Sequence, residues 1–255
     1  DIFFRPPPPA MARFVVRRLG VMPYLPCLEL QLRLLEARLQ GQVEDTLLLV
    51  EHPHVYTIGK RQTQGDILWS AETLRQKGVE VHKIDRGGQV TYHGPGQLVG
   101  YPIFNASRLH HRLTGAPEGS KFSYWWVERL QSILMKTVTA HGVPQCGVTS
   151  DVGIWVGDRL DRKVAAIGIQ LKQGCSMHGF ALNVSSDLGF YAGIVPCGLK
   201  DKFVTSLAAE SADPTLSVAS VMDTVVRAFE AEFQATAVDG PGGEDSGGAP
   251  AAPAG

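Results

Sequence analysis

The segment from Asp85 to Gln97 constrains this chain more than any other, because glycine turns stand on both sides of a short strand-like run. Gly87-Gly88 lets the backbone approach a ligand closely, since glycine has no Cβ. Gly94-Pro95-Gly96 forces a tight turn directly after His93. No Gly-Lys-Ser/Thr follows, so the segment is not a phosphate loop. A hairpin with a solvated Arg86 is the plainer interpretation, but an arginine and a histidine among four glycines favour a binding site.

Composition limits the class of protein. With 255 residues and 44% hydrophobic content, the chain can bury one large core or two small ones. A formal net charge of −1 supplies no basic field for nucleic acid. No apolar run reaches the roughly 18 to 20 residues of a membrane helix. The four cysteines form no C-x-x-C pair, which argues against a zinc ribbon or a disulfide framework. We therefore expect a globular protein of a reducing compartment, without nucleic-acid or membrane partners.

The two ends of the chain differ from its middle. Residues 1–10 contain four consecutive prolines and are expected to be disordered, as is the Gly/Ala/Pro-rich tail 237–255. The predicted catalytic domain is 11–236. Its first residues, Met11 to Arg18, are rich in arginine and lack acids. This pattern is typical of a mitochondrial targeting signal, so we predict a mitochondrial protein. The alternative is an edge strand with exposed arginines in a bacterial cytoplasmic enzyme.

Hydrophobic periodicity predicts strands alternating irregularly with helices. Several strands are consecutive, which indicates an α/β or α+β single domain with a mixed sheet. A polar stretch, 105–120, is predicted to be a loop. The expected strands are 46–50, 79–84, 89–92, 97–104, 152–156, 163–171 and 177–184, and the expected helices are 28–39, 71–77, 122–141 and 216–233.

Two histidines flank a proline at positions 52 and 54. Histidine is a common metal ligand, but a metal site needs at least a third protein ligand, and none is visible nearby. We therefore favour a loop or pocket role for His52 and His54 and expect no metal.

The second half of the chain contains candidates for a reactive group. Lys163 opens an otherwise apolar strand, and Cys197 lies in a Pro-Cys-Gly turn. A free cysteine is more often a small core residue than a nucleophile. A thiol with an ordinary pKa of about 8.5 needs a nearby cation or base to become a thiolate. Lys163 can supply that charge, and it can move protons if desolvation lowers its own pKa.

From about Val15 to Ser206 the chain resembles, in order and spacing, the octanoyltransferases of lipoate biosynthesis. The motifs that carry the resemblance are Arg86-Gly87-Gly88-x-x-Thr91-Tyr92-His93-Gly94-Pro95-Gly96-Gln97, Gly153-Ile154-Trp155, Lys163-Val164-Ala165-Ala166-Ile167-Gly168, His178-Gly179-x-Ala181-Leu182-Asn183 and Pro196-Cys197-Gly198.

The resemblance implies the fold of biotin and lipoate protein ligases and an acyltransferase that needs no cofactor. Octanoyl-acyl carrier protein would donate the acyl group to Cys197 as a thioester, with Lys163 tuning the thiol. The acceptors would be lipoyl domains of 2-oxoacid dehydrogenases and the glycine cleavage H protein. The acyl pocket implied by the resemblance comprises Arg86, Gly87, Gly88, Gln89, Val90, Thr91, Tyr92, His93, Ala166, Ile167, Gly168, His178, Gly179, Phe180 and Ala181.

Some alternatives remain open at this point. An ATP-dependent lipoate or biotin ligase of the same fold would not need Cys197, and a non-catalytic binding module would need neither Cys197 nor Lys163. Either His93 or His178 would handle the proton of the acceptor amine. Two extra residues before Lys163, within 158–162, are expected to be absorbed in a loop. We expect a monomer.

Overall fold

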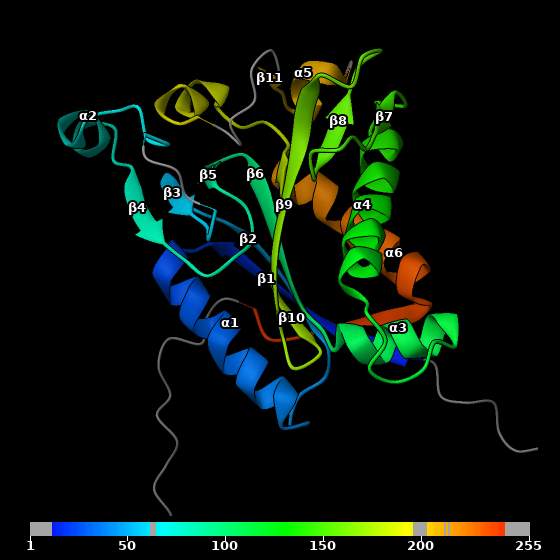
Figure 1. Cartoon of the computed structure of the whole chain (residues 1–255). Helices are drawn as coiled ribbons and strands as arrows, with labels where there is room; N and C mark the ends of the chain where they lie inside the picture. Colours follow the sequence, from blue (N-terminus) through cyan, green and yellow to red (C-terminus); the bar gives the residue numbers. More distant parts are fainter. Residues whose placement is uncertain (1–11, 62–64, 196–202, 212, 214, 243–255) are drawn as a thin grey trace, which may run out of the picture.

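The computed structural model describes residues 12–61, 65–195, 203–211, 213 and 215–242. In this part of the chain the framework is a nine-stranded mixed sheet with the order β12-β1-β2-β6-β10-β9-β8-β7, and β11 pairs with β9 (Figure 1). Its strands are β1 (Ala12–Val21), β2 (Thr46–Glu51), β6 (Gln97–Ile103), β7 (Cys146–Gly147), β8 (Ile154–Val156), β9 (Arg162–Lys172), β10 (Cys175–Asn183), β11 (Phe203–Val204) and β12 (Ala235–Asp239).

A second, smaller sheet has the order β4-β3-β5. β3 (Val55–Ile58) pairs in parallel with β4 (Glu80–Lys83) and antiparallel with β5 (Val90–His93). The helices are α1 (Tyr24–Leu39), α2 (Ala71–Gln76), α3 (Ala106–Thr114), α4 (Ser123–Ala140), α5 (Leu207–Glu210) and α6 (Val218–Phe233), with a 3₁₀ helix η1 at Leu188–Gly193.

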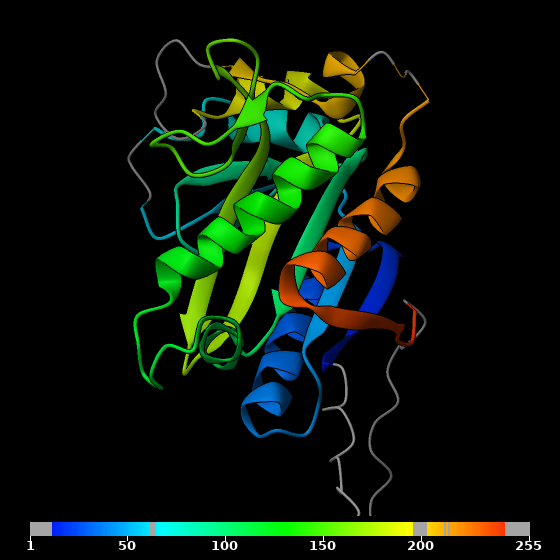
Figure 2. The same ribbon diagram turned by 90° about the vertical axis from the view of Figure 1, so that its right-hand side faces the viewer.

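The large sheet separates two hydrophobic cores. β2 is a continuous apolar run because both of its faces are buried. Leu47 and Leu49 belong to the core beneath α4 and α6, whereas Leu48 and Val50 belong to the core beneath α1. Figure 2 shows α4 and α6 lying side by side across one face, with α1 behind the sheet. The predicted mixed α/β architecture is confirmed.

One predicted loop is wrong, because residues 105–120 contain α3. The Asn105 side chain accepts a hydrogen bond from Arg108 N (2.9 Å) and caps the helix. Gly115 ends the helix with a φ of 70°, which glycine adopts without strain. Leu109 anchors the helix in the core. Only one narrow side of this helix is buried, so its sequence is mostly polar and led to the prediction of a loop.

The first strand also differs from expectation, since β1 is an interior strand. It lies between β2 and β12, and both pairings are parallel. β12 shows that the domain boundary predicted after residue 236 is wrong: Ala235 to Asp239 pair with Ala12 to Val16. The backbone N–H of Gly240 continues the contact by donating to Val16 O (2.8 Å).

The arginines of β1 are structural. Arg13 pairs with Glu44 (2.6 Å), and Arg18 pairs with Asp223 (2.9 Å) and with Asp239. Arg17 donates to the Pro241 carbonyl oxygen (2.9 Å). Within the described ranges no helix is long and apolar enough to cross a bilayer.

Candidate active site

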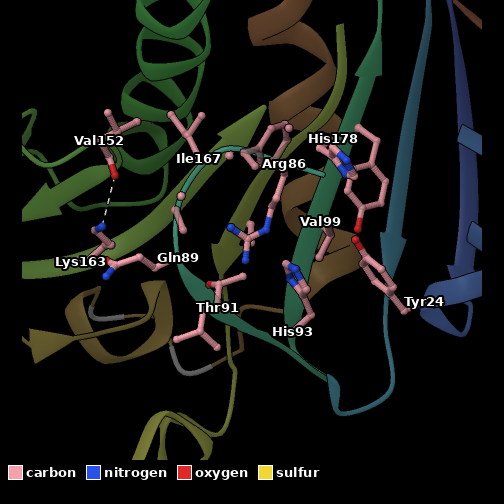
Figure 3. Close-up of a pocket in the computed structure, with 18 residues that line it drawn as sticks. Tyr24, Arg86, Gln89, Thr91, His93, Val99, Val152, Lys163, Ile167 and His178 are labelled. Atoms are coloured by element: carbon pink, nitrogen blue, oxygen red, sulfur yellow. Dashed lines mark hydrogen bonds between the residues drawn. The ribbon is translucent and has the colours of Figure 1, made fainter. Parts of the chain in front are cut away.

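A narrow cavity opens where the small sheet meets β9 and β10 of the large sheet (Figure 3). Its empty volume is about 540 Å³ when the open solvent at its mouth is included. Its lining residues are Tyr24, Arg86, Gly88, Gln89, Val90, Thr91, His93, Val99, Tyr101, Val152, Lys163, Ala166, Ile167, Gly168, His178, Gly179, Phe180 and Ala181.

This cavity brings together Lys163 and all the predicted pocket residues except Gly87 and Tyr92. Gly87 instead donates its backbone N–H to Ile169 O (3.0 Å), which ties the glycine loop to β9. Tyr92 is not among the residues that line this cavity. Its ring stacks on Phe190 with centroids 5.3 Å apart, and its hydroxyl bonds to His54 Nδ1 (2.9 Å). Along β5 the Tyr92 side chain points to the face opposite that of Thr91 and His93.

Four lining residues were not predicted. Val99 and Tyr101 lie on one face of β6, and because this strand is buried along its whole length, its sequence does not distinguish that face from the other. Tyr24 begins α1, and Val152 precedes β8. Their contact with the cavity depends on tertiary packing alone, for which the local sequence holds no signal.

Arg86 forms the centre of the cavity wall and is only 7% exposed. Its Nη2 donates to Thr57 O (2.6 Å) and Thr57 Oγ1 (2.9 Å), and its Nη1 donates to Gly87 O (2.9 Å). The absence of a Cβ at Gly168 permits this packing: a Cβ there would lie 3.1 Å from Gly87 O and 3.2 Å from Arg86 Cδ. Gly87 and Gly168 therefore allow the buried guanidinium group of Arg86 to pack against β9.

Lys163 lies near the start of β9 with a side chain that is largely buried. Its Nζ donates to Val152 O (3.2 Å) and lies 4.6 Å from the centroid of the Trp155 ring. Gly153 has a φ of +145°, and a Cβ there would lie 3.1 Å from Lys163 Cε. A turn at 157–160 joins β8 to β9, and Lys163 lines the cavity.

Cys197 lies outside the described residues, but the chain after it is placed. β11 runs parallel to β9, with Phe203 opposite Arg162 and Val204 opposite Lys163. Thr205 N then donates to Lys163 O (2.9 Å). The described chain therefore resumes, six residues after Cys197, beside the start of β9.

The other three cysteines are poor nucleophile candidates. Cys27 and Cys175 are buried. Burial raises the pKa of Cys27 to about 12 and also raises the pKa of Cys175. Cys146 is half-buried beside Met135 and Thr139, away from the cavity. Among the described cysteines, none lines the cavity.

A chain of side-chain amides fixes the tautomer of His93. The Asn183 amide donates to Thr205 O (3.0 Å), so its Oδ1 faces the Gln97 amide nitrogen (2.9 Å). Gln97 also donates to Tyr92 O (3.1 Å), which leaves its Oε1 to accept from His93 Nδ1 (2.8 Å). His93 Nδ1 therefore carries the proton, and Nε2 is left as an acceptor.

Three histidines around the cavity are held neutral. Burial lowers the pKa of His93 to about 3, with smaller contributions from His52, Arg86 and His178. Burial likewise lowers the pKa of His52 and of His178 to about 4 each. His52 bonds to Met22 O (2.7 Å) and to the Tyr101 hydroxyl (2.9 Å). At neutral pH Arg86 contributes a positive charge beside His93 and His178.

These pKa values predict a loss of stability in mild acid. Above pH 6.5 the three rings are neutral in the folded and unfolded chain and contribute nothing. Below pH 6.5 the unfolded chain binds protons that the folded chain does not. Between pH 7.5 and 5.5 we expect the free energy of unfolding to fall by on the order of 4 kcal/mol. Urea denaturation at several pH values measures this effect.

A matched variant measures the contribution of a single histidine to the pH dependence of the free energy of unfolding. His52→Gln removes one titrating ring, so its stability should depend on pH less steeply by about one proton. An unfolding free energy that stays level from pH 7.5 to 5.5 would contradict the burial of neutral rings.

Comparison with known proteins agrees with this geometry. The family described as the lipoyl protein ligase A/B catalytic domain matches residues 23–230. An octanoyltransferase of Acidobacterium capsulatum is 42% identical over 219 residues, covering 84% of this chain and 88% of that protein. The chain belongs to the octanoyltransferase family. A further octanoyltransferase, from Solibacter usitatus, is 40% identical over 88% of this chain and 92% of its own length.

Membership of the octanoyltransferase family confirms the predicted acyltransferase class. Solved structures confirm the fold. A bipartite lipoate protein ligase of Thermoplasma acidophilum has a TM-score of 0.66 at 13% identity, covering 90% of this chain and 86% of that one. Lipoate-protein ligase A bound with ATP has a TM-score of 0.65 at 14% identity, covering 90% of this chain and 88% of that one.

Proposed function

We propose that the chain transfers an octanoyl group from octanoyl-acyl carrier protein to a lysine of a lipoyl domain, through a thioester on Cys197. The observation that carries this proposal is the position of Lys163. Its ammonium group is buried at one end of a narrow cavity, and β11, which begins six residues after Cys197, pairs with β9 at Lys163. Such a cation stabilises a thiolate.

The first step forms the enzyme thioester. The Cys197 thiolate attacks the carbonyl carbon of the octanoyl thioester, and the bond to the carrier's phosphopantetheine sulfur breaks. The leaving thiolate takes a proton from Lys163. Backbone N–H groups at the Cys197-Gly198 turn and at the glycines beside His93 and His178 are our candidates to hold the oxyanion. Because the thioester is already activated, no ATP is consumed.

The second step forms the amide. The lysine amine of the lipoyl domain attacks the enzyme thioester, the Cys197 sulfur leaves as a thiolate, and Lys163 takes up the amine's proton. We assign the orientation of this amine to His93 rather than to His178, because its Nε2 is an acceptor with a fixed tautomer. In Figure 3 His93 also lies nearer the middle of the cavity, whereas His178 lies at the end remote from Lys163.

The rest of the cavity suits a medium-length acyl chain. Where the paired strands β9 and β10 line the cavity at Ala166, Gly168, Gly179 and Ala181, no side chain is larger than a methyl group, and the cavity forms a slot over these strands. Val99 adds an apolar wall from β6. Each methylene buried in such a slot contributes about 0.8 kcal/mol, so the depth of the slot selects the length of the chain.

An ATP-free transfer assay tests this function. Wild-type protein with octanoyl-acyl carrier protein and a lipoyl domain should produce octanoylated acceptor without ATP. Free octanoate or lipoate with ATP should yield neither acceptor product nor pyrophosphate. Pyrophosphate release would support the ligase alternative, and no product under either condition would support a non-catalytic binding module.

We also propose that this enzyme works in a bacterial cytoplasm rather than in a mitochondrion. The two octanoyltransferases compared above are bacterial, and the ion pairs of Arg13 and Arg18 account for arginines that resemble a targeting signal. Residues 1–40 fused to a fluorescent reporter should give a diffuse signal in eukaryotic cells. Mitochondrial import of the reporter would restore the targeting interpretation.

A further inference from the structure

At its end remote from Lys163, the cavity shares a lining residue with a second hollow. This outer groove is lined by Leu28, Leu32, Leu35, Lys83, Ile84, Asp85, Gln170, Lys172, Met177 and His178. Among the described residues, His178 alone lines both the cavity and the outer groove. Figure 3 shows Lys163 at one end of the cavity and His178 with Tyr24 at the other. His178 therefore stands where a chain that begins beside Lys163 would end.

The backbone of His178 is held from several sides. Its φ is +55°, a left-handed conformation that is rare for histidine. Its N–H donates to the side chain of Gln31 (3.1 Å), a fully buried residue of α1. At the next residue, a Cβ on Gly179 would overlap the Gly100 carbonyl oxygen, so β10 is pressed against β6. The imidazole ring thus forms a rigid wall, because its backbone cannot shift to make room.

The surroundings of the ring are those of a wall and not of a catalytic base. Its Nδ1 is buried and has no hydrogen-bond partner among the described residues. The side chain is only 2% exposed, and burial keeps it uncharged at neutral pH by lowering its pKa to about 4. On its far side, Leu28, Leu32, Leu35 and Met177 provide apolar surface that the cavity does not reach.

We propose that the His178 ring closes the acyl slot and so sets the longest acyl chain that the enzyme accepts. Removing the ring would join the slot to the outer groove, whose leucines would then receive the end of a longer chain. This inference rests on the proposed function, because it assumes that the acyl chain runs from Lys163 toward His178.

The substitution that tests it is His178→Gly. Glycine removes the wall and also suits the positive φ, so the backbone is relieved rather than strained. Octanoyl- and dodecanoyl-acyl carrier proteins compete in one reaction, and mass spectrometry gives the ratio of the two products on the lipoyl domain. Each additional buried methylene is about fourfold in affinity. If two of the four extra methylenes are buried, the dodecanoyl-to-octanoyl ratio rises about 15-fold over wild type.

Control variants make the outcome specific. His178→Phe keeps a wall of similar size, and its ratio should stay close to that of wild type. Leu32→Asp lies in the outer groove and should not alter the wild-type ratio, but combined with His178→Gly it should cancel the gain. If His178→Gly does not fold, His178→Asn applies the same test, since asparagine is shorter and tolerates this φ.

The outcomes separate the proposal from the function beneath it. A His178→Gly variant that transfers octanoyl groups with an unchanged ratio overturns the role of His178 and leaves the function intact. A gain that persists in the double variant overturns the outer groove as the place of the chain end. Failure of wild-type protein to transfer octanoyl groups is a failure of the proposed function itself.

Discussion

Replacing Lys163 with alanine is expected to slow octanoyl transfer by about 10²- to 10⁴-fold, the usual loss when a positioned acid–base group is removed. The Nζ is held by Val152 O and by the Trp155 ring, in a largely buried position beside β11. Its loss removes the positive charge that stabilises the thiolate and the group that moves the proton. The fold should persist, because the sheet contacts of β9 are made by the backbone.

Alkylation kinetics distinguish this role from a structural one. The rate of Cys197 alkylation in Lys163→Ala should follow a pH profile shifted upward, toward the ordinary thiol pKa of about 8.5. Lys163→Arg should restore the charge but not the turnover, since a guanidinium does not deprotonate in proteins. Equal alkylation rates for wild type and Lys163→Ala at every pH would show that Lys163 does not activate the thiol.

Replacing Cys197 with serine is expected to abolish nearly all turnover. An alcohol is a far weaker nucleophile at its free pKa than a thiol, and it requires a stronger base. Steady-state octanoylation of a lipoyl domain measures the loss, and circular dichroism verifies the fold. Cys175→Ser is the matched control. Cys175 is buried, with its pKa raised by burial and without contact with the cavity, so this variant should keep its activity.

The result that opposes the mechanism is equally clear. A Cys197→Ser variant that still turns over would favour direct transfer between the bound thioester and the acceptor lysine. A Cys175→Ser variant that loses activity while remaining folded would indicate that Cys197 had been wrongly identified as the acyl carrier.

Local patterns were sufficient to predict the parts of the site that each segment carries. The glycines around Arg86 and the small residues after Lys163 are visible in the sequence, and the structure places both segments on one cavity. The continuous apolar run of β2 likewise indicates a strand that is buried on both faces. These features depend on neighbours within a few residues, so sequence alone reveals them.

Features made by distant segments were missed. Tyr24 reaches the cavity from the start of α1, and β12 pairs with β1 across almost the whole chain. The parallel pairing of β3 with β4 is of the same kind. Such contacts are selected by the packing of the complete sheet, and short strands carry little signal of their own. Tyr101 lies on β6, which is buried along its whole length, so its sequence does not distinguish the face that lines the cavity from the other face.

Intact mass spectrometry of the wild-type enzyme tests the central claim most directly. Mixing with octanoyl-acyl carrier protein, without ATP, should add one octanoyl group to the enzyme. Peptide mapping should place that group on Cys197, and hydroxylamine should remove it. Adding a lipoyl domain should then clear the label and leave a hydroxylamine-stable amide on the acceptor lysine. An octanoylated acceptor that appears without any labelled enzyme, or a label on another residue, would contradict a thioester on Cys197.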